Sequence, residues 1–250
     1  LPLAGIAELP TPLEDFGPQG VEALSRLGSL HVKRDDRTSA RYGGNKVRKL
    51  DFLLGQALHE GRAAVLTFGA YGSNHCLATA VHVRARGMEP HVVLSPQEPG
   101  PFAPATLLAH ARLGTVIHLT DGWDGAREAV RAIRALTERD GTEPFVIPMG
   151  GTNGLSTLGH VNAALEALEQ GPPPDVVYVA GGTQGTSLGL AIGFALAGAR
   201  TRVEAVRVTP EEVGGPQQLE SVAAETFELL ASLDQGMQRF GLEDLRLRMR

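Results

Sequence analysis

Short apolar runs alternate with longer amphipathic segments along most of this 250-residue chain. Most of the short runs are continuously apolar, which is typical of parallel strands covered on both faces. We predict strands at Leu30–Arg34, Ala64–Phe68, Pro90–Leu94, Thr115–Leu119, Pro144–Pro148, Asp175–Ala180 and Arg202–Thr209. We predict helices at Lys46–Glu60, Ser73–Arg86, Ala105–Leu113, Gly125–Arg139, Leu155–Gln170 and Ser187–Ala197. The first helix should pack one apolar face, formed by Val47, Leu50, Leu54, Ala57 and Leu58, and should end at Gly61.

This alternation predicts an α/β protein with parallel, doubly wound sheets and right-handed crossovers. Functional residues in such sheets gather where strands end and helices begin. Four loops of this kind are rich in glycine, so we expect residues 42–45, 69–74, 150–154 and 181–185 to approach one another. After Thr209 the sequence is acidic and helical in pattern, and it predicts no strand.

Composition argues against several classes of protein. The formal net charge is −5, so the chain lacks the overall basic charge typical of nucleic-acid-binding proteins. The content of hydrophobic residues, 42%, is ordinary for a globular protein. No apolar run reaches membrane-spanning length, and the N-terminal segment lacks the features of a secretory signal. A single cysteine excludes an internal disulfide framework, and no cluster of residues has metal-ligand spacing. We therefore expect a cytoplasmic protein without a metal.

The segment GGNKVRKL contains two of only three lysines in the chain, Lys46 and Lys49; the third is Lys33. Gly43 and Gly44 permit sharp turns, so Lys46 falls in the first turn of a predicted helix. The positive end of the helix dipole disfavours an ammonium there and should lower the pKa of this lysine. A neutral amine is the form that makes a Schiff base with an aldehyde. A solvated, basic helix start is the alternative interpretation.

The segment GAYGSNHCLATA follows a predicted strand and contains Ser73, Asn74 and His75. Free backbone N–H groups and short polar side chains at this helix start could hold a carboxylate. Taken alone, the segment favours a simpler interpretation, in which Ser73 or Asn74 caps the helix. The imidazole of His75 could act as an acid or base or stack on a ligand, but a hydrogen-bonded structural role is at least as strong an interpretation. Cys76 is better interpreted as buried and inert than as reactive.

The segment VVYVAGGTQGTSLGL joins an apolar strand to a helix of small residues through a glycine-rich turn. Backbone amides at such a helix start bind phosphate, and the hydroxyls of Thr183 and Thr186 add donors. The same segment matches GxSxG around Ser187, the nucleophile motif of α/β hydrolases. All eight histidines precede Ser187, so the chain order required for that triad is absent. A nucleotide-binding protein that uses only this turn remains an alternative, but it leaves the lysine segment unexplained.

Together these segments, with PTPLEDF near the start and IPMGGTNGLSTLGHVNA, resemble the 1-aminocyclopropane-1-carboxylate deaminase and D-cysteine desulfhydrase family of pyridoxal-phosphate enzymes. The resemblance implies the two-domain tryptophan synthase β-like fold, known as pyridoxal-phosphate fold type II. Residues 1–46 with 160–250 would form the large cofactor-binding domain, and 47–159 the small domain. It also implies a homodimer that releases ammonia and a 2-keto acid from a small amino acid.

The resemblance further implies roles for single residues. Lys46 would carry pyridoxal 5'-phosphate as a Schiff base and move the substrate proton. Asn74 would bond the 3'-oxygen of the pyridine ring, while Ser73, with neighbouring groups up to His75, would receive the substrate carboxylate. The phosphate would be held by Gly182, Thr183, Gln184, Gly185 and Thr186, with Lys49 as an additional contact.

This chain also departs from the family pattern. Gly72 stands where the family usually has glutamine, Leu77-Ala78 where it has Arg-Gln, and the phosphate loop contains Gln184 and Ser187 in place of glycines. Nothing after Thr209 matches the C-terminal region that carries the family's active-site tyrosines and pyridine-nitrogen partner. Opening of a cyclopropane ring therefore has no support in the sequence. A homologue that binds the cofactor or an amino acid without deaminase activity is the alternative hypothesis.

Overall fold

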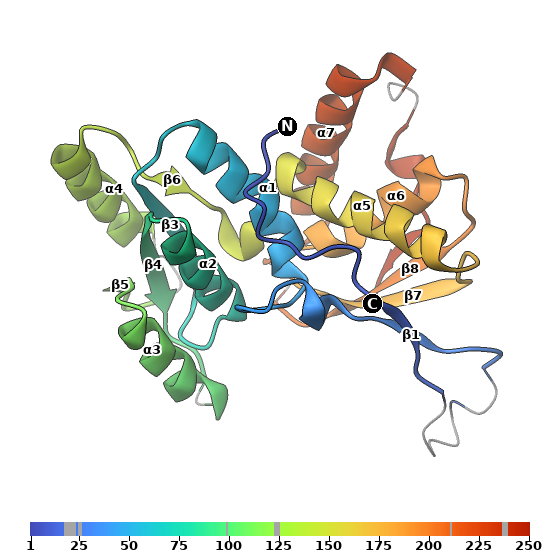
Figure 1. The fold of residues 1–250 in the computed structure, drawn as a ribbon, viewed down its shortest axis with the longest axis horizontal. Coiled ribbons are helices and arrows are strands. Elements are labelled where there is room, and N and C mark those ends of the chain that lie inside the picture. The colour runs from blue at the N-terminus through green and yellow to red at the C-terminus, as the bar shows by residue number, and fades with distance from the viewer. Residues whose placement is uncertain (18–23, 25–26, 99, 123–125, 211, 237–239) are drawn as a thin grey trace.

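The fold is that of a computed structural model, which describes residues 1–17, 24, 27–98, 100–122, 126–210, 212–236 and 240–250. It contains one four-stranded and one three-stranded parallel sheet, together with a two-stranded antiparallel hairpin. Figure 1 shows the two parallel sheets in different parts of the molecule, with helix α1 (Lys46–His59) between them. The predicted α/β class with parallel sheets is confirmed.

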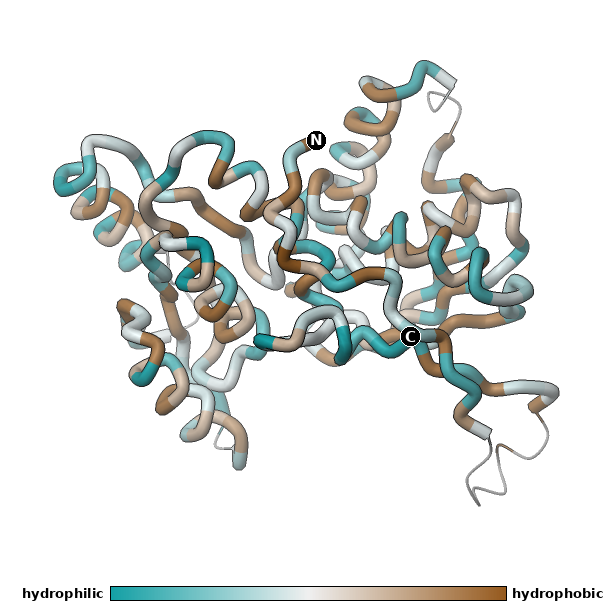
Figure 2. The backbone as a smooth tube through the Cα atoms, in the orientation of Figure 1, coloured by the Kyte–Doolittle hydropathy of each residue, from teal (hydrophilic) through white to brown (hydrophobic). Residues whose placement is uncertain are grey.

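The four-stranded sheet has the order β5-β4-β3-β6, and all of its pairings are parallel. Helices cover both faces because adjacent strand residues point in opposite directions. Val65 packs with the helices α1 and α2 (Asn74–Ala85), whereas Leu66 packs with α4 (Ala126–Asp140). In Figure 2 the helix α4 carries hydrophobic and hydrophilic positions turn by turn, as expected for a helix with one buried side. The strands are β3 (Ala64–Ala70), β4 (Glu89–Ser95), β5 (Val116–Leu119) and β6 (Phe145–Val146).

The three-stranded sheet has the order β7-β8-β9. On one face, Val177 and Val179 pack with Phe194 of helix α6. On the other, Tyr178 is 66% exposed and Val206 is 45% exposed. In the described part of the chain, this sheet therefore buries one face and presents apolar side chains on the other. The strands are β7 (Val176–Gly181), β8 (Arg202–Arg207) and β9 (Leu247–Met249).

The helices follow the predicted order closely. Those next to the four-stranded sheet are α1 (Lys46–His59), α2 (Asn74–Ala85), α3 (Phe102–Arg112) and α4 (Ala126–Asp140). The others are α5 (Gly154–Gln170), α6 (Gly185–Leu196) and α7 (Pro216–Leu233). Of the predicted helix ends, only Gly125 lies outside the described residues. Within the described residues, short 3₁₀ helices also lie at Asp35–Arg37, Met149–Gly151 and Leu242–Asp244.

Two predictions about strands are wrong. The segment predicted as a parallel strand at Leu30–Arg34 forms β2 (His31–Lys33), which pairs antiparallel with β1 (Leu13–Asp15). The region after Thr209 does contain a strand, β9, which adds to β8 in parallel. Strands of three residues are too short for their periodicity to distinguish them from loop sequence.

Helix α1 is buried around most of its circumference because it lies between the two parts of the molecule (Figure 1). Four of its five predicted apolar face residues are fully buried, but Leu58 is 39% exposed, so the predicted face ends one residue earlier. Gly61 follows the helix with φ +66°, as expected for a residue that terminates it. The division into domains 1–46 with 160–250 and 47–159 stays a prediction.

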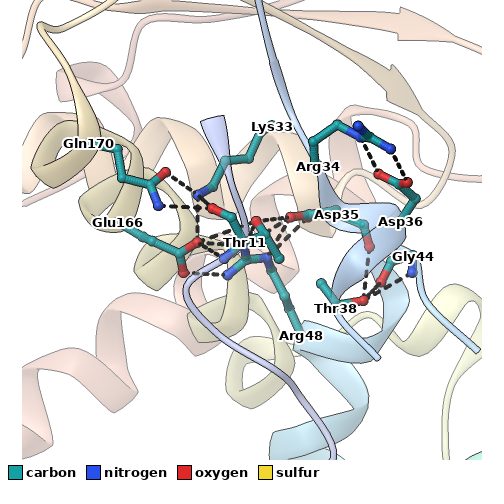
Figure 3. A network of polar contacts seen from close by, with 10 residues as sticks. All are labelled: Thr11, Lys33, Arg34, Asp35, Asp36, Thr38, Gly44, Arg48, Glu166 and Gln170. Atoms are coloured by element: carbon teal, nitrogen blue, oxygen red, sulfur yellow. Dashed lines mark hydrogen bonds and ion pairs between the residues drawn. The ribbon is translucent and has the colours of Figure 1, made fainter. Parts of the chain in front are cut away.

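Arg48 ties three distant segments to α1 (Figure 3). Its fully buried guanidinium donates hydrogen bonds of 2.8–3.1 Å to Asp35, Glu166 and Thr11. Burial alone would lower the pKa of Arg48, but the bonds from its two carboxylate partners raise it. The N-terminal segment, the first 3₁₀ helix and α5 are thereby held against the start of α1, where Lys46 lies.

Candidate active site

Lys46 is the first residue of α1 and is half-buried. The backbone turn just before Lys46 requires glycine. A Cβ on Gly43 would overlap the carbonyl group of Asp36, and Gly44 has φ +127°. Burial lowers the pKa of Lys46 below its usual value. The predicted helix-start position and the predicted direction of the pKa are both found, although desolvation, rather than the helix dipole, is the cause that the structure identifies.

Lys49, one turn further along α1, is fully buried. Its Nζ donates hydrogen bonds to Thr152 Oγ1 at 2.7 Å and to the carbonyl oxygen of Gly150 at 3.3 Å. Both partners are neutral, and burial followed by the charge of Lys46 holds the pKa of Lys49 well below its usual value. Sequence analysis did not single out Thr152, although it identified the glycine-rich loop that contains it.

The start of α6 faces this lysine. A Cβ on Gly185 would lie 2.7 Å from Lys49 Nζ, so glycine permits this close approach. Thr183 Oγ1 is 2.6 Å from the hydroxyl oxygen of Thr152, which places the two threonines beside the same ammonium. Gln184 takes a left-handed conformation with φ +62°, unusual for a residue with a side chain, and turns the chain into the helix. The predicted phosphate loop and the predicted lysine contact therefore lie together.

The lysine loop also contacts two helix starts directly. Tyr42 donates from its hydroxyl group to Asn74 Oδ1 at 2.9 Å, and Asn45 Nδ2 donates to Thr186 Oγ1 at 3.0 Å. Gly151 in turn would place a Cβ 3.1 Å from the ring of His75. All four predicted glycine-rich loops are thus brought into contact. Sequence analysis did not assign Tyr42 and Asn45 to the site, although both flank the glycines that pointed to this loop.

At the start of α2, Ser73 Oγ accepts a hydrogen bond from the amide of Cys76 at 3.3 Å. The capping interpretation of Ser73 is therefore confirmed. Within the described residues, the amides of Asn74 and His75 have no hydrogen-bond acceptor, as is usual at a helix start. Asn74 is exposed, so its side chain is accessible to a ligand.

The ring of His75 points into the protein. Its Nε2 lies 2.9 Å from Thr67 Oγ1, and that hydroxyl group donates to the carbonyl oxygen of Ile147 at 3.0 Å. Because Thr67 has only one proton to donate, His75 must donate from Nε2, which leaves Nδ1 as a buried acceptor without a partner among the described residues. Burial, followed by the charges of Lys46 and Lys49, holds the pKa of His75 well below its usual value. A contact between His75 and substrate therefore has to use its backbone amide, and that role stays a prediction.

Two competing nucleophiles have structural positions. Ser187 is fully buried, and its hydroxyl group lies 2.8 Å from both the carbonyl and the side-chain oxygen of Gln184. Cys76 is fully buried, and burial raises the pKa of its thiol to about 12. A thiol with this pKa stays protonated and is a poor nucleophile.

The two lysines of the site have no acidic partner in the part of the chain that the structure describes. Among the described residues, neither Lys46 nor Lys49 forms an ion pair, and the amides of Thr186 and Ser187 have no acceptor. A buried lysine beside a helix start is unfavourable unless an anion joins them. A phosphate group would supply that charge and accept from the free amides. The residues therefore fit a phosphorylated cofactor.

Neither a metal centre nor a membrane span is found along the described residues. No group of three or more metal-binding side chains occurs within them. The helices described contain none that is both long and apolar enough to cross a membrane.

Comparison with protein-family models matches residues 6–242 to a family described as pyridoxal-phosphate dependent enzyme. The chain belongs to this family. The predicted cofactor is thereby confirmed at the level of the family, and so is the resemblance drawn from the lysine, Ser73 and phosphate-loop segments.

Two curated relatives carry the names suggested by that resemblance. The mitochondrial bifunctional D-cysteine desulfhydrase/1-aminocyclopropane-1-carboxylate deaminase of Arabidopsis thaliana is 34% identical over 219 residues, which cover 81% of this chain and 53% of the relative. The D-cysteine desulfhydrase of Klebsiella pneumoniae (strain 342) is 38% identical over 194 residues, which cover 74% of this chain and 58% of the relative. The chain therefore spans little more than half the length of these relatives.

Solved structures agree with the fold. A structure described as an ACC deaminase homologue superposes with a TM-score of 0.81 at 30% identity, over 92% of this chain and 70% of that one. A structure of a threonine deaminase gives a TM-score of 0.58 at 26% identity, over 79% of this chain and 59% of that one. The predicted fold type II of pyridoxal-phosphate enzymes is confirmed.

Proposed function

We propose that this protein uses pyridoxal 5'-phosphate to remove ammonia from a small amino acid, as the names of its D-cysteine desulfhydrase and 1-aminocyclopropane-1-carboxylate deaminase relatives suggest. The observation that carries the proposal is the pair Lys46 and Lys49. These two lysines lie on one helix turn with lowered pKa values and no counter-ion in the described residues. Lys46 would react as a free amine, and Lys49 would bind an anion.

Lys49 and the start of α6 would hold the phosphate group. The ammonium would contribute charge, while the backbone of Gly182, Thr183, Gln184, Gly185 and Thr186 would contribute N–H groups. The amide of Gly185 would do so in exchange for its bond to the carbonyl oxygen of Thr183. Thr183 would add a hydroxyl donor. Its hydroxyl group is hydrogen-bonded to that of Thr152, which accepts from Lys49 Nζ. The left-handed backbone at Gln184 is in keeping with this role, because residues with strained backbone conformations cluster in loops that bind ligands.

Ser73, Asn74 and His75 would orient the other groups. The exposed side chain of Asn74 would donate from Nδ2 to the 3'-oxygen of the cofactor ring, while its Oδ1 accepts from Tyr42 as it does here. The free amides of Asn74 and His75, together with the hydroxyl group of Ser73, would bind the substrate carboxylate. The two amides have no acceptor in the described structure, and the hydroxyl group of Ser73 can donate to a carboxylate while it accepts from the amide of Cys76, so binding would break no bond between protein groups.

Lys46 would move the proton. When bound, pyridoxal phosphate supplies an aldehyde that reacts with amines and a ring that accepts electron density. A lowered pKa keeps more of Lys46 in the neutral form, which can both react with an aldehyde and take a proton from the substrate carbon. The chain thus supplies a base, an anion site for phosphate and a second anion site for the carboxylate.

Absorbance spectroscopy tests the proposal. Protein titrated with pyridoxal phosphate should develop visible absorbance, and D-cysteine, L-serine or aminocyclopropane carboxylate should change the spectrum and yield a 2-keto acid. Borohydride reduction followed by peptide mass analysis should locate the covalent adduct at Lys46. An adduct of equal yield in Lys46→Ala would assign it to another lysine, and the absence of any visible band would refute cofactor binding.

Three broader features belong to the same proposal. We infer a homodimer, because the family resemblance implies one, and a cytoplasmic location, in keeping with the bacterial relative. We also infer that residues 1–46 with 160–250 move as one domain and 47–159 as the other. Light scattering and cell fractionation test the first two, and hydrogen exchange with and without cofactor tests the third.

A further inference from the structure

Gly72 lies against the side chain of a residue from a different loop. The amide of Gly72 donates to Gln97 Oε1 at 2.8 Å. A Cβ on Gly72 would lie 3.2 Å from both Gln97 Oε1 and Gln97 Nε2, so the carboxamide covers the position that a side chain would occupy. Gln97 follows β4 and is half-buried, so its carboxamide reaches the turn between β3 and α2 from the neighbouring strand of the sheet.

This contact completes the hydrogen bonding of the turn. The amide of Tyr71 donates to the carbonyl oxygen of Ser95 at 3.2 Å, and the amide of Ser73 donates to that of Ala70 at 2.9 Å. With Gly72 bonded to Gln97, three successive N–H groups are satisfied. The next two amides, at Asn74 and His75, are the ones left without an acceptor in the described residues. The amides of residues 71–73 are thus all hydrogen-bonded within the protein, whereas the two that follow them are free to bind an anion.

We propose that Gln97 is a positioning residue for the substrate carboxylate: its carboxamide holds the Gly72–Asn74 turn so that the free amides at the start of α2 point toward one place. This inference rests on the proposed function, because it takes the start of α2 as the carboxylate site. Glycine at 72 is part of the device, since a Cβ there would lie 3.2 Å from both end atoms of the carboxamide, which would then have to shift.

Two orientations of the carboxamide can be distinguished on chemical grounds. Because the backbone N–H of Gly72 can only donate, it must face the oxygen of Gln97 and not the nitrogen. Gln97 Nε2 then has no acceptor among the described residues and stays a free donor beside the turn.

Gln97→Met keeps the length of the side chain without the acceptor, whereas Gln97→Glu keeps an acceptor oxygen.

The first experiment measures hydrogen exchange of the protein without cofactor. In Gln97→Met, the amide of Gly72 loses its acceptor and should exchange about three- to tenfold faster, the factor expected for one hydrogen bond. Gln97→Glu should restore slow exchange. Gln56→Met, which alters a half-buried glutamine on α1, is the matched control and should leave this peptide unchanged.

The second experiment measures keto-acid release from D-cysteine after saturation with pyridoxal phosphate. Gln97→Met should raise KM about five- to twentyfold with kcat within about twofold of the original, because the loss concerns orientation of a bound carboxylate. Gly72→Ala should raise KM similarly. The double variant should be no worse than either single variant, since both changes remove the same contact.

The outcomes separate the two proposals. A protein that takes up no pyridoxal phosphate, or releases no keto acid, overturns the proposed function and, with it, this inference. A working protein in which Gln97→Met leaves either the Gly72 exchange rate or KM unchanged overturns the inference alone. Additive effects of Gly72→Ala and Gln97→Met would also overturn it, because two independent contacts would then be involved.

Discussion

Arg48 and Lys49 are neighbours on α1 and are both fully buried, but their surroundings are opposite. Arg48 faces two carboxylates, whereas Lys49 faces a threonine hydroxyl group and a backbone carbonyl. A buried cation without a counter-ion is unfavourable, and natural proteins retain such groups mainly where function requires them. Arg48 is therefore neutralised within the fold, whereas Lys49 lacks a protein counter-ion in the described residues, as the phosphate contact that we propose requires.

Replacing Arg48 should produce the largest effect on stability. Arg48→Met leaves Asp35 and Glu166 without their shared partner, and breaking such a buried pair should cost about 3–5 kcal/mol of unfolding free energy. Denaturant unfolding monitored by circular dichroism measures this loss. Arg131→Met is the control, because its pair with Glu128 has an arginine side chain that is 70% exposed, and it should change stability by less than about 1 kcal/mol. Equal losses in the two variants would contradict the comparison.

Replacing Lys49 should act on ligand binding instead. Lys49→Met should weaken pyridoxal-phosphate binding about 10- to 100-fold, because one charged contact to phosphate is lost. Its unfolding free energy without cofactor should stay equal or rise, since a buried amine is removed. Equilibrium dialysis and denaturant unfolding provide the two measurements. Lys33→Met should give the reverse pattern, because Lys33 pairs with Glu166 at 2.5 Å.

Acid should weaken the Arg48 cluster through Glu166. Burial alone would raise the pKa of this carboxyl group, but hydrogen bonds from Arg48 and Lys33 outweigh it and lower the pKa to about 2. Its stabilisation is therefore complete above the ordinary value of 4.5 and is lost as the pH falls from there toward 2. Unfolding free energy should fall by about 2 kcal/mol from this group in that window. Glu166→Gln, measured over the same pH range, should show a flatter decline; an identical slope would be the contrary result.

His160→Phe should give the smallest of these changes, and the change should be stabilising. Its ring is 1% exposed, and neither of its nitrogens has a partner among the described residues. Burial, followed by the charges of Lys49, Lys46 and Arg48, keeps its pKa well below the usual value. His160→Phe removes two unsatisfied polar atoms and should raise the unfolding free energy by about 1 kcal/mol, seen as a higher thermal midpoint. His59→Phe, at the exposed end of α1, should change nothing, and a loss in His160→Phe would show that the ring has a polar partner.

The sequence was sufficient for the features that depend on local pattern. Apolar runs and glycine turns predicted the order of the helices and of six strands, because each element is encoded within its own residues. The same local logic located the lysine helix, the capped helix after Ser73 and the phosphate loop. It missed β9 and misjudged the pairing of β2, because three-residue strands take their pairing from partners elsewhere in the chain.

Only the tertiary structure decided which neighbour each buried group has. Arg48 meets Glu166 across 118 residues, and Lys49 meets Thr152 across 103, and no spacing within α1 predicts that one partner is an anion and the other is neutral. The contact between Gly72 and Gln97 likewise depends on two adjacent strand ends. By itself, therefore, the sequence determined which lysines were available for chemistry. Packing determined their charge environment, because electrostatic free energy depends on distance through space and on burial, not on separation along the chain.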